Sequence, residues 1–196
     1  MVSQMNSIAY EYIKASSEMI HRLHADPTVF EGIIDVSAVC LKALKAGNKL
    51  LFIGNGGSAA DCQHMAGEYV SRFAFDRPGL SAIALTTDTS ILTAIGNDYG
   101  YDQVFSRQVQ AIGCAGDVLF AYTTSGASEN IIAALETATS KGIITVLMSG
   151  NSDRAKLVSS DYKLLVPGDS TPHIQECHAI LGHCICSIVE MLYFRG

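Results

Sequence analysis

The sequence predicts an α/β protein, a three-layer fold in which helices cover both faces of a doubly wound, parallel five-stranded sheet. Two observations support this fold. From residue 49 onwards, short apolar runs alternate with helical patterns, which is typical of a parallel sheet covered on both faces. Two amphipathic segments precede the first strand, and one long segment with helical spacing closes the chain. At 196 residues, the chain is long enough to bury such a core.

The expected elements follow one another along the chain. Two N-terminal helices are expected at 3–25 and 28–46, with Pro27 at the start of the second and Gly47 at its end. The strands are expected at 49–53, 82–85, 117–122, 144–148 and 162–166. The remaining helices are expected at 58–72, 87–96, 102–112, 128–141, 153–158 and 173–194. We therefore expect a single domain, 1–196, with a helical extension at 1–47 and an α/β core at 48–196.

Composition and charge limit the classes of partner. The formal net charge is −6 and no run of Lys or Arg occurs, which argues against binding to a nucleic-acid backbone. The N-terminus lacks the basic-then-apolar pattern of a signal peptide, and no apolar stretch is expected to reach transmembrane length. We therefore expect a cytoplasmic protein without a membrane partner. The apolar content of 48% leaves a surplus that contacts between subunits can bury.

The six cysteines form no CxxC pair. In a reducing compartment, cysteines of this kind are mostly small buried apolar residues, which is the favoured interpretation. The alternative is a metal site that combines Cys62 or Cys177 with histidines.

A glycine-rich turn, Gly54-Asn55-Gly56-Gly57-Ser58, follows the first predicted strand and opens a helix. Glycines let backbone N–H groups approach a ligand, and the start of a helix favours anions. Gly54, Gly56 and Ala59 also fit a loose dinucleotide-binding pattern. That pattern expects an acidic residue at the end of the next strand, whereas Asp76 falls in a polar loop before it. Dinucleotide binding is therefore disfavoured.

The turn after the third predicted strand, Thr123-Thr124-Ser125-Gly126-Ala127-Ser128, is the better phosphate site. Its hydroxyls and a helix N-terminus can donate to a phosphate dianion. Ordinary capping by Ser128 is the alternative, although one hydroxyl would suffice for that. Because the turn has no Lys or Arg, a sugar phosphate is favoured over a nucleoside triphosphate. A second turn, at Asn97-Asp98, either makes local hydrogen bonds or holds sugar hydroxyls or shuttles a proton.

Two pairs of polar residues lie on helix faces. His64 and Glu68 are four residues apart, and Gln175 and His183 lie two turns apart on the last helix. Together they offer two nitrogen and two oxygen ligands, which suits zinc or another borderline divalent metal. Because sequence cannot show that the two helices meet, separate structural roles remain open.

Four motifs resemble the phosphoheptose isomerase family, which has the sugar isomerase (SIS) fold. They are GNGGSAADCQHMAGE, LTTDTSILTAIGNDYGY, TTSGAS and TPHIQECHAILGH, and the resemblance covers residues 49–194. It implies a cytoplasmic homotetramer with one zinc per active site. It also implies isomerisation of sedoheptulose 7-phosphate to D-glycero-D-manno-heptose 7-phosphate through an enediol. That reaction begins the biosynthesis of activated heptose for lipopolysaccharide or capsule.

The resemblance further implies residue roles. The zinc ligands would be His64, Glu68, Gln175 and His183, with Glu68 and His183 as the acid/base pair. The substrate would contact Asn55, Gly56, Gly57, Ser58, Glu68, Asn97, Asp98, Thr123, Thr124, Ser125, Ser128 and Gln175. Asp98 or Asp61 would assist ring opening. Where the family usually reads STSGNS, this chain has TTSGAS, so Ala127 replaces an Asn of the phosphate loop.

Two other functions remain open from the sequence. One is a non-catalytic SIS-type module that associates with a replication initiator, although such a scaffold would not need the four candidate metal ligands. The other is an isomerase or sensor of a different sugar phosphate on the same fold.

Overall fold

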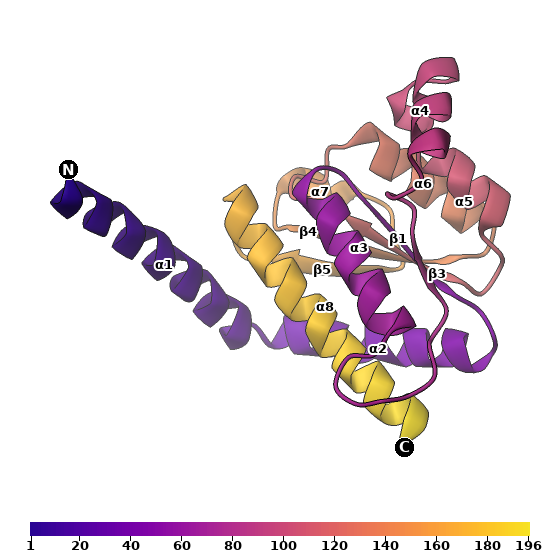
Figure 1. Cartoon of the computed structure of the whole chain (residues 1–196), viewed down its shortest axis with the longest axis horizontal. Coiled ribbons are helices and arrows are strands. Elements are labelled where there is room, and N and C mark those ends of the chain that lie inside the picture. The colour runs from indigo at the N-terminus through magenta and orange to yellow at the C-terminus, as the bar shows by residue number, and fades with distance from the viewer.

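The computed structural model describes all 196 residues, and its centre is a parallel sheet. The strands are β1 (Leu50–Gly54), β2 (Ala82–Ala84), β3 (Val118–Tyr122), β4 (Ile144–Gly150) and β5 (Tyr162–Val166). They lie in the order β2-β1-β3-β4-β5, and every neighbouring pair is parallel (Figure 1). The strand order thus reverses between β1 and β3. Such a reversal leaves a crevice at the carboxyl ends of these strands, where doubly wound folds bind ligands. The predicted fold class is confirmed.

Helices shield both faces of the sheet from water. One face is covered by α2 (Pro27–Lys45), α3 (Gly57–Val70) and α8 (Thr171–Phe194), with the end of α1 (Val2–Ala25). The other face is covered by α4 (Thr89–Asp98), α5 (Ser106–Ile112) and α6 (Glu129–Ser140). A short 3₁₀ helix, η1 (Tyr101–Gln103), connects α4 to α5, and α7 (Asp153–Leu157) follows β4.

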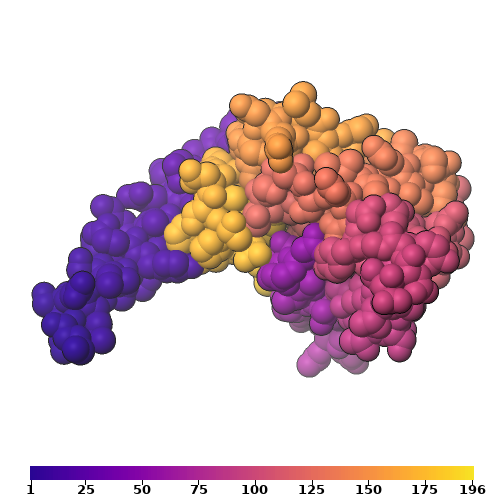
Figure 2. All heavy atoms as spheres, turned by 90° about the horizontal axis from the view of Figure 1, so that it is seen from above, coloured from indigo at the N-terminus to yellow at the C-terminus, as the bar shows by residue number.

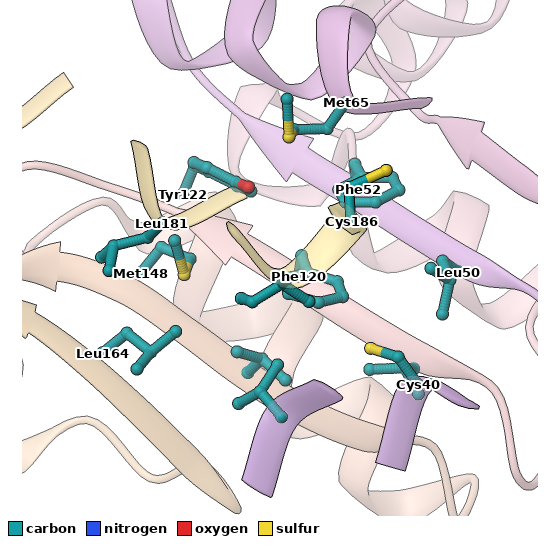
Figure 3. Close-up of a cluster of buried hydrophobic side chains, with 14 of the residues drawn as sticks. Cys40, Leu50, Phe52, Met65, Phe120, Tyr122, Met148, Leu164, Leu181 and Cys186 are labelled. Atoms are coloured by element: carbon teal, nitrogen blue, oxygen red, sulfur yellow. The ribbon is translucent and has the colours of Figure 1, made fainter. Parts of the chain in front are cut away.

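The strands divide their side chains between two apolar clusters, because successive residues of a strand point to opposite faces. In β1, Leu50 and Phe52 join the larger cluster under α2, α3 and α8, whereas Leu51 and Ile53 join the smaller one. Figure 3 shows the larger cluster, in which the rings of Phe52 and Phe120 stack with centroids 5.0 Å apart. Both central strands are buried along their whole length. They therefore form a rigid frame for the loops at their ends.

Every predicted strand and helix is present, with small differences at the boundaries. The expected helix 87–96 is α4, which begins after Asp88, whose carboxylate caps the first turn, and continues through Asp98. Asn97 and Asp98 therefore lie in the last turn of a helix, and the expectation that they form a turn is wrong. Two residues after α4, the backbone of Gly100 has a φ of +93°, a value that no α-helix residue adopts and that favours glycine. The expected helix 102–112 is divided into η1 and α5.

The two N-terminal helices differ in their relation to the core. The side chains of Val36 and Cys40 in α2 are fully buried against the sheet. In contrast, most of α1 projects from the body of the protein (Figures 1 and 2). Its middle is held to α8 by polar contacts: the Tyr12 hydroxyl donates to Glu176 (3.1 Å), and Ser16 pairs with His173 (3.1 Å). The division of the chain at residue 47 stays a prediction, and α2 packs as part of the core.

The cysteines are all free thiols, and four of them, Cys40, Cys62, Cys177 and Cys186, are buried. Burial raises the pKa of the Cys177 thiol to about 11. No cluster of potential metal ligands includes a cysteine. The four buried cysteines are therefore small core residues. Cys114 and Cys184 are exposed.

The last helix differs from expectation in one respect. By length and composition alone, α8 is apolar enough to cross a membrane, with a mean hydropathy of 1.5. The expectation that no apolar stretch reaches transmembrane length is therefore wrong. In the fold, α8 packs against α2, α3 and the strands, and this packing accounts for its apolar character.

Candidate active site

A cluster of three potential metal ligands, His64, Glu68 and His183, forms where α3 and α8 pack together. The Nε2 atoms of His64 and His183 are 2.8 Å apart, and the His64 Nε2 lies 3.6 Å from the Glu68 carboxylate. One ligand atom from each residue lies within 4.8 Å of the others. The structure thus brings together two helices that are over 100 residues apart in the sequence.

These ligand groups have different access to solvent. The His64 side chain is 50% exposed, whereas that of Glu68 is 22% exposed. The ring of Phe73 packs against that of His183, with ring centroids 5.5 Å apart, and His183 is half-buried. The cluster is therefore most open to solvent at His64, where a small polar molecule can reach it.

Gln175 lies beside the glycine-rich turn at the start of α3, the helix that carries His64 and Glu68. A Cβ atom placed on Gly57 would lie 2.6 Å from Gln175 Nε2 and 2.8 Å from Oε1. Glycine at this position therefore allows the Gln175 amide to lie beside the start of α3. Gly56 allows the tight turn before α3, because its φ of +57° is a backbone conformation that favours glycine. Ser58 follows in the first turn of α3 and is buried.

The loop after β1 and the first turn of α6, which follows the hydroxyl-rich loop after β3, are joined by a reciprocal amide pair. Asn55 Nδ2 donates to Asn130 Oδ1, and Asn130 Nδ2 donates to Asn55 Oδ1, each at 2.9 Å. The Tyr101 hydroxyl donates to the same oxygen of Asn55 (3.1 Å). Beside this pair is a hollow of about 480 Å³, also lined by Asp102 and Ser128. Its carbonyl, amide, hydroxyl and carboxylate groups suit a polyhydroxyl compound.

The hydroxyl-rich turn curls back on itself. The Thr123 hydroxyl accepts from the Gly126 N–H, and the Ser125 hydroxyl accepts from the Ala127 N–H, both at 3.2 Å. Ser128 occupies the capping position of α6 but makes no side-chain capping bond, so the ordinary capping interpretation is wrong. Its hydroxyl is therefore available to a ligand at the helix N-terminus. The Thr124 side chain lies beside α8, 3.5 Å from the Thr171 hydroxyl.

Asn97 and Asp98 are the predicted site residues that the fold does not bring to this cluster. Both are exposed at the end of α4, and the Asn97 amide donates to the Asp98 carboxylate (2.8 Å). Figures 1 and 2 show α4 away from α8. Within this chain, their side chains therefore make only the local hydrogen bond.

Two ionisable groups, the half-buried Asp61 and the buried His178, lie close to the site. Burial raises the pKa of Asp61, and the nearby His64 offsets part of this effect. Burial lowers the pKa of His178 to about 4, although the nearby Ser149 backbone opposes the shift. His178 is therefore neutral near pH 7 and packs edge-on against Tyr122, with ring centroids 5.6 Å apart.

Several residues that surround the site were not found from the sequence. They are Phe73, Arg77, Tyr101, Asp102, Asn130 and Glu190. Asn130 follows the hydroxyl-rich turn, and the sequence predicts for it only a place in the helix that begins there. Tyr101 closes the motif LTTDTSILTAIGNDYGY, but no role was expected for it. The others lie outside the quoted motifs, and no local signal marks them.

Comparison with known proteins agrees with this geometry. The family model of the SIS domain matches residues 11–150. The phosphoheptose isomerase of Aneurinibacillus thermoaerophilus is 50% identical over 192 residues, which is 98% of this chain and 97% of the relative. That of Burkholderia pseudomallei strain K96243 is 52% identical over 93% of this chain and 92% of the relative.

The chain belongs to the phosphoheptose isomerase family. It is accordingly an aldose–ketose isomerase with the SIS fold. The solved structure of phosphoheptose isomerase GmhA from Neisseria gonorrhoeae is similar throughout, with a TM-score of 0.88 and 37% identity. The similarity covers 95% of this chain and 98% of that one. A non-catalytic scaffold is thereby disfavoured, and the resemblance seen in the sequence motifs is confirmed.

Proposed function

We propose that this isomerase converts sedoheptulose 7-phosphate to D-glycero-D-manno-heptose 7-phosphate, the first step towards activated heptose for lipopolysaccharide or capsule. The observation that carries the proposal is the cluster of His64, Glu68 and His183 beside the two ligand-binding loops of the crevice. The cluster supplies acid/base groups for the reacting end of a sugar. The loops supply polar groups for its hydroxyls and phosphate.

The reaction moves a proton between adjacent carbons through an enediol, which requires a base near both carbons and an acid near the oxygens. Glu68 on α3 is the carboxylate base that takes the carbon-bound proton and returns it to the neighbouring carbon. His183 on α8 is placed across from it and transfers protons at the two oxygens. Asp61 lies close enough to His64 for the imidazole to offset part of the rise that burial causes in the Asp61 pKa, and it is a candidate for ring opening.

The four polar residues fit a divalent metal, which we propose is zinc. Two imidazole nitrogens, a carboxylate and the amide of Gln175 are a ligand set that zinc or a similar metal accepts. The 2.8 Å approach of two imidazole nitrogens supports this assignment, because neutral rings can converge on a cation as they converge here. When bound, zinc polarises the sugar's carbonyl and stabilises negative charge on oxygen.

The loops orient the long substrate. The Thr123–Ser128 turn holds the phosphate, with Thr124, Ser125 and Ser128 donating to it at the N-terminus of α6. Asn55 and the backbone of Gly56–Gly57, which follow β1, bind sugar hydroxyls. Asn97 and Asp98 keep their proposed role along the sugar only if a neighbouring subunit brings them to the site.

Substrate profiling tests this proposal most directly. Purified protein is assayed for aldose–ketose interconversion with C5, C6 and C7 ketose phosphates, before and after removal of metal by a chelator. We expect turnover of the C7 substrate only, loss of turnover on chelation, and recovery with zinc. Preference for a C5 or C6 substrate would assign the same site to another sugar phosphate. Full activity after exhaustive chelation would remove the metal from the mechanism.

We also propose that the enzyme is a cytoplasmic homotetramer. Large apolar side chains are exposed along α1, including Val2, Met5, Ile8 and Ile13, each more than half exposed. Such a row on a projecting helix is typical of a surface that another subunit covers. Analytical ultracentrifugation of the full chain measures the assembly. A monomer at micromolar concentration would contradict this part of the proposal.

A further inference from the structure

We propose that the buried Arg77–Glu190 ion pair is a positioning device for the metal-binding groups. It holds the end of α3 that carries Glu68, and it places the Phe73 ring against His183. This inference rests on the proposed metal site at His64, Glu68 and His183. It assigns to residues outside the cluster the task of setting the distance between its two helices.

Glu190 is the residue of α8 that binds both Arg77 and the loop after α3. Its Oε1 accepts from the Phe73 N–H and from Arg77 Nε, and its Oε2 accepts from the Ala74 N–H, all at 2.8 Å. The side chains of Arg77 and Glu190 are only 2% and 1% exposed. A carboxylate so deeply buried must be paired and fully hydrogen-bonded to be tolerated. Glu190 meets this condition by binding the 71–77 loop.

Arg77 closes the C-terminal end of α3. The last carbonyls of a helix lack partners within the helix. The Arg77 guanidinium donates to the carbonyls of Glu68 (2.8 Å), Tyr69 (2.6 Å) and Ser71 (3.2 Å). Its positive charge also suits the negative end of the helix dipole. The backbone of Glu68, the candidate base, is therefore bonded directly to the ion pair.

Phe73 connects the same ion pair to His183. Its backbone N–H is held by Glu190, and its ring lies tilted by 33° against the His183 ring. Glu190 follows His183 by seven residues, which is two turns along the same face of α8. One buried carboxylate thus fixes both the helix that carries His183 and the ring that packs on it.

A purely structural role is the competing explanation, because buried ion pairs also occur for packing alone. The chain contains a matched pair that can distinguish the two. Asp117 is also buried, also accepts two backbone N–H groups (Lys49 and Cys114), and also pairs with a cation, the Lys49 ammonium at 2.6 Å. It lies at the amino end of β3, and its hydrogen-bond partners, Lys49 and Cys114, belong to neither α3 nor α8.

The test measures Co²⁺ binding by the full-length protein, from the visible absorption of the bound ion and by competition with a chelator. The variants are Phe73→Leu and Arg77→Lys, with Asp117→Asn as the control. Leucine keeps an apolar contact but removes the ring, and lysine keeps the charge but cannot reach several carbonyls in the geometry of a guanidinium. We expect both variants to weaken Co²⁺ binding by about 10- to 100-fold and to alter its absorption spectrum.

The control variant distinguishes an effect on the position of the metal ligands from a general loss of protein stability. We expect Asp117→Asn to lower the melting temperature while its Co²⁺ affinity stays within about twofold of wild type. If Arg77→Lys fails to fold, Phe73→Leu alone decides the outcome. Unchanged Co²⁺ affinity and spectrum in Phe73→Leu would overturn the inference.

The test also distinguishes failure of the inference from failure of the proposed metal. If the wild-type protein binds no Co²⁺ or zinc, the metal proposal fails. Crystal structures of the variants then test the positioning role without a metal. We expect the distance between the Nε2 atoms of His64 and His183, 2.8 Å here, to increase by about 1 Å or more in Phe73→Leu, a displacement large enough to impair catalysis. An unchanged distance would overturn the inference.

Discussion

Replacing Asn130 with alanine should uncouple the two loops of the crevice. The change removes two hydrogen bonds to Asn55, each 2.9 Å long, and leaves the Asn55 amide with only the Tyr101 hydroxyl as a protein partner. At about 1 kcal/mol for each bond, plus the cost of an incompletely paired amide, the loss in the free energy of unfolding is about 2–3 kcal/mol. For a chain of this size, that corresponds to a fall in melting temperature of about 4–12 °C.

A double-mutant cycle measures the pair itself. Asn55→Ala, Asn130→Ala and the double variant are unfolded in urea, and the coupling free energy is expected to be about 1–2 kcal/mol. Gln108 is the control, because its buried amide bonds to the Leu85 and Val104 carbonyls and not to the pair. Asn130→Ala and Gln108→Ala should be additive within about 0.5 kcal/mol. Additivity of the Asn55 and Asn130 substitutions would refute the reasoning.

Three further predictions concern the acid/base pair, the phosphate loop and acid stability. Glu68→Gln and His183→Gln should each lower kcat by about 10²–10⁴-fold while circular dichroism shows the fold intact, and near-normal turnover would remove the assigned role. Ser125→Ala should raise KM for the phosphorylated substrate more than it lowers kcat, as measured by steady-state kinetics. The Phe73 and Ala74 N–H groups and Arg77 lower the pKa of Glu190 against the opposing effect of burial. The unfolded chain therefore takes up this proton at higher pH than the folded one. The stabilisation is complete above the unfolded pKa and is lost as the pH falls through the depressed folded value. Melting temperatures measured from pH 7 to pH 3 should show this loss in the wild type and a smaller one in Glu190→Gln.

Much of the fold could be predicted from the sequence because it depends on local patterns. Apolar runs such as Leu50–Ile53 predict buried strands, and turns rich in glycine or hydroxyl groups mark their carboxyl ends. The predicted end of α4 is wrong because Asn97 and Asp98 favour turns locally, whereas the helix continues through Asp98. The sequence does not present α8 as one apolar run, because its polar motif residues interrupt the apolar pattern, although its mean hydropathy is high.

The sequence by itself determined the strand–turn–helix order, the chemistry of the loops, and the spacing that puts His64 near Glu68 and Gln175 in line with His183. These features depend on residues a few positions apart, whose relation is set by the geometry of one helix or one turn. Only the tertiary structure decided that α3 and α8 meet, that Asn55 pairs with Asn130, and that Arg77 and Glu190 close the end of α3. Those contacts join residues separated by 75 to 119 positions. They exist because burial of the apolar faces brings distant segments together, and buried polar groups must then find partners wherever the packing places them.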